Sequence, residues 1–210
     1  MKIETRKYRL TGMEMMLGSN PSDPQVRKAY IESKRPPEAP SEDESANTPE
    51  IDEDKGLTVF LLHPQTGGPM VYDYTIRGFF KDVINTLASQ TGVLGAKSKV
   101  DKYLFVSPRH IPLMNTAGAR VKTTDGIYER SLRAMTAQGP RVTLAGSEFV
   151  KDWMVEIEVS LLENKETAKG KAITWAVVED ALDYGRLSGL GQWRNGGFGR
   201  FTWEQILTGR

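Results

Sequence analysis

Two amphipathic helical segments alternate with four strand-like segments in this sequence of 210 residues. The first helix is predicted from Thr75 to Ala88, because its apolar residues recur at intervals of three and four positions, and Gly92 lies beyond its end. The second helix is predicted to begin at Trp175, with Thr174 as its N-cap. Its inner face is predicted to carry the apolar residues that follow at helical spacing.

The strand-like segments surround these helices. Residues 153–162 alternate apolar and polar side chains, which is typical of a strand with one buried face. The other three strands of the plan are predicted at residues 6–16, 102–106 and 199–203. Two further apolar runs are predicted as a buried strand or hairpin arm and as a short strand, at residues 57–62 and 141–145 respectively.

Without its insertions, the chain has the order β-α-β-β-α-β. This order predicts an α+β fold with a ferredoxin-like (RRM-like) core and large insertions. Two helices then cover one face of an antiparallel sheet, and the other face is free to be covered or to bind a partner. The composition of 39% hydrophobic and 26% charged residues suits a single domain, residues 1–210, with a real core.

Several classes of site are excluded by composition. The sequence has no cysteine, so disulfides, thiolate zinc sites and cysteine nucleophiles are absent. No apolar stretch approaches the length of a membrane span, and the N-terminus does not resemble a signal peptide. We therefore expect a cytoplasmic protein with no membrane partner.

Residues 33–56 form a flexible acidic insertion in this prediction. Proline, serine and acidic residues dominate it, and eight acids lie between Glu38 and Asp54. The net charge of the whole chain is only +1, so the remaining body is distinctly basic. A solvated loop is the favoured interpretation. The alternative is a segment that mimics nucleic acid or shields a basic groove.

The densest glycine run of the chain, "GLGQWRNGGFGRF" at residues 189–201, precedes the last strand. Glycines let main-chain N–H groups approach phosphates, arginines can pair with phosphate oxygens, and Trp193 or Phe198 could stack on a base. The residues predicted to contact nucleic acid here are Trp193, Arg194, Gly196, Gly197 and Arg200. The alternative is a tight connection between the second helix and the last strand. The run does not match the P-loop pattern.

A second basic region spans residues 97–141. Residues 114–150, which overlap this region, are predicted to form a basic insertion or thumb. Lysine and arginine without compensating acid are the pattern expected of a nucleic-acid surface. The predicted contact residues are Lys97, Lys99, Arg120, Lys122, Arg130, Arg133 and Arg141. A solvated basic face is the alternative.

The catalytic candidates are fewer. His63 and His110 are the only histidines, and His110 with Arg109 or Lys102 could cleave RNA through its 2′-hydroxyl. Prolines near both histidines favour structural turns instead. No catalytic residue, metal or cofactor is therefore expected.

Carboxylates on the second helix, Glu179, Asp180 and Asp183, could hold Mg²⁺ beside a phosphate. The favoured interpretation is that they form the solvated face of that helix, since no metal-binding sequence pattern accompanies them.

Three segments resemble the repeat-associated mysterious protein (RAMP) superfamily of CRISPR systems, and phage or prophage relatives of it. These are "LTGMEMMLGS", which is similar to its first strand, "YDYTIRGFFKDVINTLA", which is similar to the entry of its first helix, and the glycine run. Where that family has Gly-Ser-Ser at the helix entry, this chain has Ile76-Arg77-Gly78. The resemblance covers about half of the chain and implies an RNA-binding fold, closer to the backbone-type subunits than to the processing nucleases.

The leading hypothesis is a non-catalytic protein that binds single-stranded RNA, or single-stranded DNA, mainly through its phosphates and self-assembles along the strand as a homo-oligomer or filament. The first alternative is a metal-independent endoribonuclease that uses His110. The second is a protein that imitates a CRISPR complex subunit and acts by binding CRISPR-type effector subunits.

Overall fold

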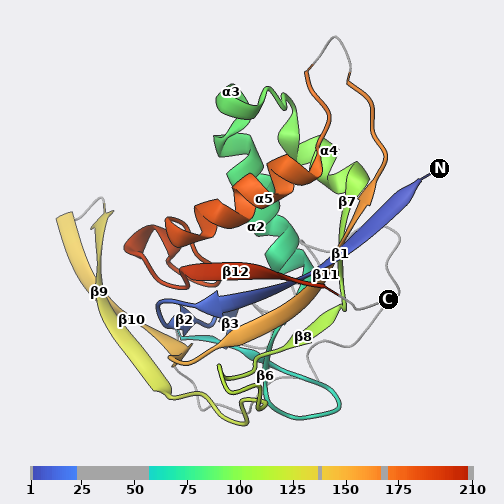
Figure 1. Cartoon of the computed structure of the whole chain (residues 1–210). Helices are drawn as coiled ribbons and strands as arrows, with labels where there is room; N and C mark the ends of the chain where they lie inside the picture. The colour runs from blue at the N-terminus through green and yellow to red at the C-terminus, as the bar shows by residue number, and fades with distance from the viewer. Residues whose placement is uncertain (1, 23–56, 137–138, 167–169, 208–210) are drawn as a thin grey trace.

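The computed structural model describes residues 2–22, 57–136, 139–166 and 170–207, with only the backbone described for 132–136 and 139–144. The predicted acidic insertion at residues 33–56 lies outside the described residues. Within the described part of the chain, the fold is α+β, with helices packed over a central sheet (Figure 1).

The central sheet has four strands in the order β12-β1-β11-β7, and every neighbouring pair is antiparallel. Its strands are β1 (Ile3–Gly12), β7 (Leu104–Ser107), β11 (Met154–Leu162) and β12 (Phe201–Ile206). One long helix lies between the first and second of these strands, and another between the third and fourth. This order and connectivity are those of the ferredoxin-like plan. β1 and β11 are antiparallel neighbours at the centre of the sheet. The helical connections that follow these two strands therefore cross the same face of the sheet.

The helices α2 (Asp73–Thr86) and α5 (Trp175–Asp183) cover that face (Figure 1). The predicted stripe of the first helix is confirmed, since Phe79 and Phe80 are among its buried residues and belong to the same core as Tyr8 on β1. The hydroxyl of Thr174 accepts a hydrogen bond from the Val177 N–H at 3.4 Å, so the predicted cap of α5 is also confirmed. Burial of each large apolar side chain stabilises the fold by about 1.5–3 kcal/mol.

Two shorter helices follow α2, namely α3 (Ala88–Thr91) and α4 (Ala96–Tyr103). The predicted strand of residues 102–106 starts two residues late, because α4 occupies the chain up to Tyr103. Helix α4 was not predicted, since only Ala96 and Val100 provide it with a buried face. After α5 and before β12 come two short 3₁₀ turns, Tyr184–Arg186 and Arg194–Gly196.

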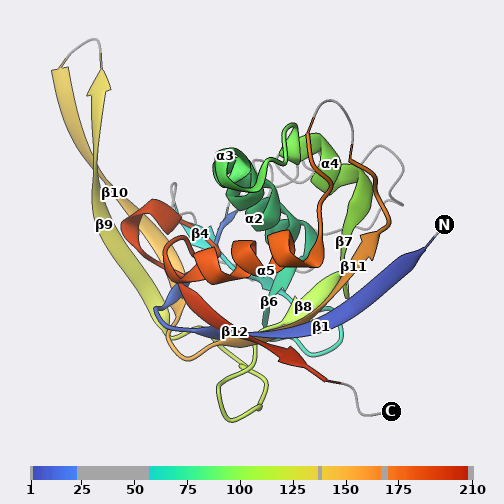
Figure 2. The same cartoon turned by 45° about the horizontal axis from the view of Figure 1, so that its top comes forward.

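A long antiparallel hairpin projects from the body of the molecule (Figure 2). It consists of β9 (Gly126–Thr136) and β10 (Gly139–Val150). The prediction of a short strand at residues 141–145 is wrong in extent, because the strand is extended at both ends by pairing with β9 from Gly139 to Phe149. The hairpin lies within the predicted insertion at residues 114–150.

The remaining strands are short: β2 (Met16–Leu17), β3 (Asn20–Pro21), β4 (Thr58–Val59), β5 (Leu61–Leu62), β6 (Pro69–Tyr72) and β8 (His110–Pro112). The apolar run of residues 57–62 is not one strand, since β4 pairs with β3 and β10 while β5 pairs with β6. The break falls at Phe60, whose N–H donates to the Glu148 carboxylate at 2.9 Å instead of to a neighbouring strand.

Candidate nucleic-acid interface

A groove of about 950 Å³ runs beside the first half of α2, and we call it the first hollow. The start of α2 lines it together with α4 and the glycine-rich loop, residues 189–200. Residues Ser19 and Asn20 also contribute to its lining. The fold therefore brings the start, middle and end of the chain to one surface.

Four cations line the first hollow, Arg77, Lys81, Lys97 and Arg194, against two carboxylates. Asp101 holds two of these cations, with its Oδ1 at 2.5 Å from Lys81 Nζ and 3.5 Å from Arg77 Nη2. Arg77 Nη2 also donates to the Asp101 carbonyl oxygen at 2.7 Å. Because the exposed Lys97 adds a further charge, this hollow is positive on balance.

The second hollow, of about 550 Å³, adjoins the first. The two share Asp82, Arg194 and Asn195 as lining residues, and an ion pair of 2.9 Å joins Asp82 to Arg194. Arg200 adds a second arginine to its lining. The first and second hollows, which we call the α2 groove, are thus neighbouring parts of one track along the helix.

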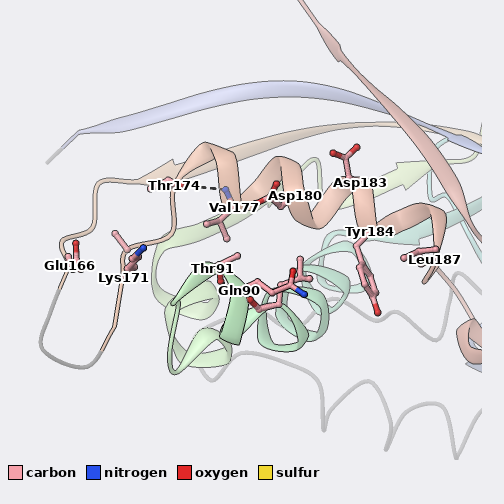
Figure 3. A pocket seen from close by; sticks show the side chains of 12 residues that line it. Gln90, Thr91, Glu166, Lys171, Thr174, Val177, Asp180, Asp183, Tyr184 and Leu187 are labelled. Carbon is pink, nitrogen blue, oxygen red and sulfur yellow. Dashed lines mark hydrogen bonds between the residues drawn. The ribbon is translucent and has the colours of Figure 1, made fainter.

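The third hollow, of about 660 Å³, has the opposite charge (Figure 3). It shares Tyr184 and Leu187 with the second hollow. Its charged lining residues are Glu166, Lys171, Asp180 and Asp183. An anionic strand is therefore favoured in the α2 groove and disfavoured beyond it.

The glycine-rich loop is a folded structure closed on itself. The N–H of Leu190 donates to the Gly199 carbonyl at 2.9 Å, and the N–H of Gly199 donates to the Met15 carbonyl at 2.9 Å. Gly199 has a φ of +66°, and a Cβ there would overlap the Leu190 carbonyl oxygen. The glycine at this position is thus required by close approach of two backbone segments.

The predicted phosphate contacts within the loop have partners of their own. The N–H groups of Gly196 and Gly197 donate to the carbonyls of Trp193 and Arg194, at 2.9 and 3.0 Å. The Nε of Arg200 donates to the Gly197 carbonyl at 3.0 Å, so this side chain braces the loop. Arg194 is paired as well, since its Nη2 donates to the Asp82 carboxylate at 2.9 Å, but this partner lies outside the loop.

Trp193 connects the loop to the projecting hairpin. Trp193 is 40% exposed, and its ring stacks on Phe198 with a centroid separation of 5.2 Å. The Arg130 guanidinium lies 4.2 Å from the Trp193 ring centroid, and Tyr128 packs on Phe198 at 5.1 Å. Arg130, predicted to contact nucleic acid, thus reaches Trp193 from β9, and the two faces of the Trp193 ring are taken by Phe198 and Arg130 instead of being open to a base.

Three other predicted cations, Lys99, Arg120 and Lys122, do not line the α2 groove. Lys99 donates to the carbonyls of Gly170 and Lys171, at 3.2 and 2.6 Å, and so connects α4 to the chain before α5. Arg120 and Lys122 are exposed on the connection between β8 and β9. The backbones of Arg133 and Arg141 lie in the hairpin, and their side chains are outside the described residues.

Two groove cations, Arg77 and Lys81, were missed by the sequence analysis. They are four positions apart on α2 and line the first hollow together. Their spacing of four positions on the polar side of an amphipathic segment was the available signal.

On the open face of the central sheet, Lys7 and Arg9 are each paired with glutamate. Lys7 on β1 lies 2.7 Å from Glu158, and Arg9 lies 2.8 Å from Glu156 and 2.7 Å from Glu204. Because glutamates neutralise the cations of this face, the α2 groove offers a more positive surface than the sheet does.

The two histidines are neighbours in space. The ring centroids of His63 and His110 are 6.0 Å apart, and His110 lies 5.1 Å from the Tyr72 ring. The pKa of His63 is lowered, mainly because burial disfavours the charged imidazolium, and the positive charges of His110 and Arg120 add to this effect. Sequence reasoning had treated the two side chains separately.

The carboxylates of α5 have separate environments. Glu179 pairs with Arg6 at 2.9 Å, Asp183 accepts a hydrogen bond from Trp203 Nε1 at 2.9 Å, and Asp180 lines the third hollow. In the described part of the chain, no three acidic or histidine side chains gather as a metal ion would require.

No protein-family model matches this sequence, and no curated protein matches it. Among solved structures, the chain is similar to one from "Cryo-EM structure of the Type III-B Cmr-beta bound to cognate target RNA". The identity is 8% and the TM-score is 0.48, over 98% of this chain and 60% of that chain. This chain thus spans about three-fifths of the length of the one it matches. None of the helices in the described ranges is long and apolar enough to cross a bilayer.

Proposed function

We propose that this protein binds single-stranded nucleic acid, RNA in preference, without catalysis and mainly through phosphates in the α2 groove. The observation that carries the proposal is the first hollow, where Arg77, Lys81, Lys97 and Arg194 meet. Arginine and lysine neutralise phosphates whatever the base sequence of the strand. The RAMP resemblance supports the same reading and stays a prediction.

The test compares two lysines that are both paired with a carboxylate. Lys81 lies in the groove beside Asp101, and Lys7 lies on the open sheet face beside Glu158. Lys81→Ala combined with Lys97→Ala should weaken binding of a fluorescent single-stranded RNA for every sequence tested. Each lost phosphate contact should also flatten the slope of log K against log salt by about 0.7.

Lys7→Ala combined with Arg9→Ala removes two cations from the open sheet face and is the matched control, which should leave both the affinity and the salt slope unchanged. Equal losses from the two sites would mean that net charge, rather than the groove, governs binding. Affinity for RNA that survives the groove double substitution, with the fold intact by circular dichroism, would reject the proposed site. Duplex and single-stranded competitors then establish the preferred form.

Self-assembly along the strand is the second part of the proposal. Strands β7 and β12 are the two edges of the central sheet, and an edge strand presents unpaired backbone groups to a neighbour. Light scattering of the protein with and without RNA should show a mass that grows with RNA length. A constant mass of one protein per RNA would reject this part alone.

A metal-independent endoribonuclease is the second candidate function, because His63 and His110 lie side by side. One neutral imidazole would take the 2′-hydroxyl proton, and the 2′-oxygen would attack the adjacent phosphorus. The second, protonated imidazole would give its proton to the departing 5′-oxygen, which leaves a 2′,3′-cyclic phosphate. RNA that is cut in the presence of a chelator by the wild type but not by His110→Ala would favour this candidate. Intact RNA in both cases favours the binding protein.

A further inference from the structure

The ion pair between Asp82 and Arg194 lies where the first and second hollows meet. Both residues line both hollows, and the pair joins α2 to the tip of the glycine-rich loop at 2.9 Å. A strand that occupies the whole α2 groove therefore has to pass this pair. The groove follows α2 from Tyr74 to Thr86, which is about 18 Å at 1.5 Å per residue. That length accepts about five nucleotides at a stacked spacing of about 3.4 Å.

The pair is easily broken. The side chains of Arg194 and Asp82 are 32% and 51% exposed, so water screens their attraction. A phosphate offers the guanidinium two parallel charge-assisted hydrogen bonds, which are stronger than one contact with an exposed carboxylate. Arg194 can therefore exchange its carboxylate partner for a phosphate.

The rest of the loop stays in place during such an exchange. The N–H of Gln192 donates to the Leu17 carbonyl at 3.0 Å, and the closure between Leu190 and Gly199 does not involve Arg194. Trp193 is held separately by Arg130 and Phe198. Only the Arg194 side chain needs to move.

We propose that Asp82 regulates the affinity of the α2 groove by competing with the phosphodiester backbone for Arg194. The inference rests on the proposed function and adds its regulation: binding is an exchange in which phosphate replaces carboxylate. After the exchange, the Asp82 carboxylate has no cation and repels the bound strand. Because Asp82 and Arg194 line both hollows, a strand that occupies either one experiences this competition.

The test is a double-mutant cycle on RNA affinity. Asp82→Asn should tighten binding of a single strand about fivefold at low salt, because an exposed ion pair that must be broken opposes binding by up to about 1 kcal/mol. Arg194→Ala should weaken binding, and Asp82→Asn should have no further effect in that background. Glu204→Gln is the matched control, since Glu204 is also an exposed partner of an arginine but lies on the open sheet face.

A second readout separates this inference from the proposed function. The Arg194 Nε–Hε resonance is followed by NMR during titration with tripolyphosphate, for the wild type and for Asp82→Asn. A response at lower tripolyphosphate concentration in Asp82→Asn supports the exchange even where no RNA binds, and the nucleic-acid function then fails alone. The inference is overturned where Asp82→Asn leaves both readouts unchanged. It is also overturned where Glu204→Gln tightens RNA binding as much as Asp82→Asn does. The same holds where Asp82→Asn tightens binding as much in the Arg194→Ala background as in the wild type.

Discussion

The charge state of His63 makes stability depend on pH. Because the pKa of His63 is lowered from 6.5 by burial, the unfolded chain binds a proton at this position more readily than the folded protein does. The contribution of His63 to the free energy of unfolding is therefore fully present above pH 6.5. It is lost as the pH falls from 6.5 through the pKa of His63 in the folded protein. The free energy of unfolding in urea should therefore fall across that window, and His63→Gln should flatten the fall. An identical pH profile for His63→Gln would contradict this account.

Gly199 is the position in the glycine-rich loop where a side chain is least tolerable. Its positive φ and the adjacent Leu190 carbonyl oxygen predict that Gly199→Ala destabilises the protein by about 2 kcal/mol or more. Gly78 on α2 is the control, because a Cβ there meets nothing within 4 Å. Gly78→Ala should stabilise by about 0.5–1 kcal/mol. Chemical denaturation measures the free energy of unfolding of both variants. Equal changes in Gly199→Ala and Gly78→Ala would mean that the loop rearranges freely to accept a side chain at Gly199.

Predictability at the residue scale depends on where the deciding partner lies. The Thr174 cap was predicted because its partner Val177 is three residues away. The partner of Arg194 is Asp82 on α2, and that of Arg130 is the Trp193 ring. Such partners follow from tertiary packing, so the sequence identified these arginines without revealing what they contact.

At the element scale, the β9–β10 hairpin and the glycine-rich loop are joined through Arg130 and Trp193. A double-mutant cycle of Arg130→Ala and Trp193→Ala should give a coupling energy of about 0.5–1 kcal/mol in the free energy of unfolding. Glu129→Ala paired with Trp193→Ala is the comparison cycle, because Glu129 is the exposed neighbour of Arg130 on β9. Strict additivity in the Arg130 cycle would show that the ring and the guanidinium do not interact in solution.

Elements that carry a clear hydrophobic period in their own residues were predicted, whereas β9 and helix α4 were not. Helix α2 carries its buried stripe within its own sequence, so its existence did not depend on a partner. The two-residue strands β2 to β5 are defined by pairing between distant segments, such as Ser147 with Thr58. Two residues are too few to show a period, which is why these small sheets escaped prediction.

At the scale of the whole molecule, the order of elements determined the plan of the central sheet. A β-α-β-β-α-β order leaves few compact arrangements once crossovers are short and right-handed, and the observed order β12-β1-β11-β7 is one of them. The groove was less predictable, because it combines α2, α4 and the glycine-rich loop. The charge of the surface changes from positive in the α2 groove to negative in the third hollow. This change depends on where the fold places the acids of α5, so the sequence alone does not reveal it.

The last prediction concerns the charge of the whole chain. The eight acids between Glu38 and Asp54 offset eight cations, so the chain without them would carry a net charge of +9 instead of +1. Charges act over about 30 Å at 0.01 M salt but only about 3 Å at 1 M. Deletion of residues 37–54 should therefore speed association with single-stranded RNA at low salt, and the difference should vanish at high salt. A variant that keeps this segment but replaces its acids with glutamine and asparagine should behave like the deletion, as stopped-flow fluorescence can measure. Faster association in the deletion alone would mean that the segment obstructs RNA by its bulk, and no change in either variant would mean that its charge lies too far from the groove.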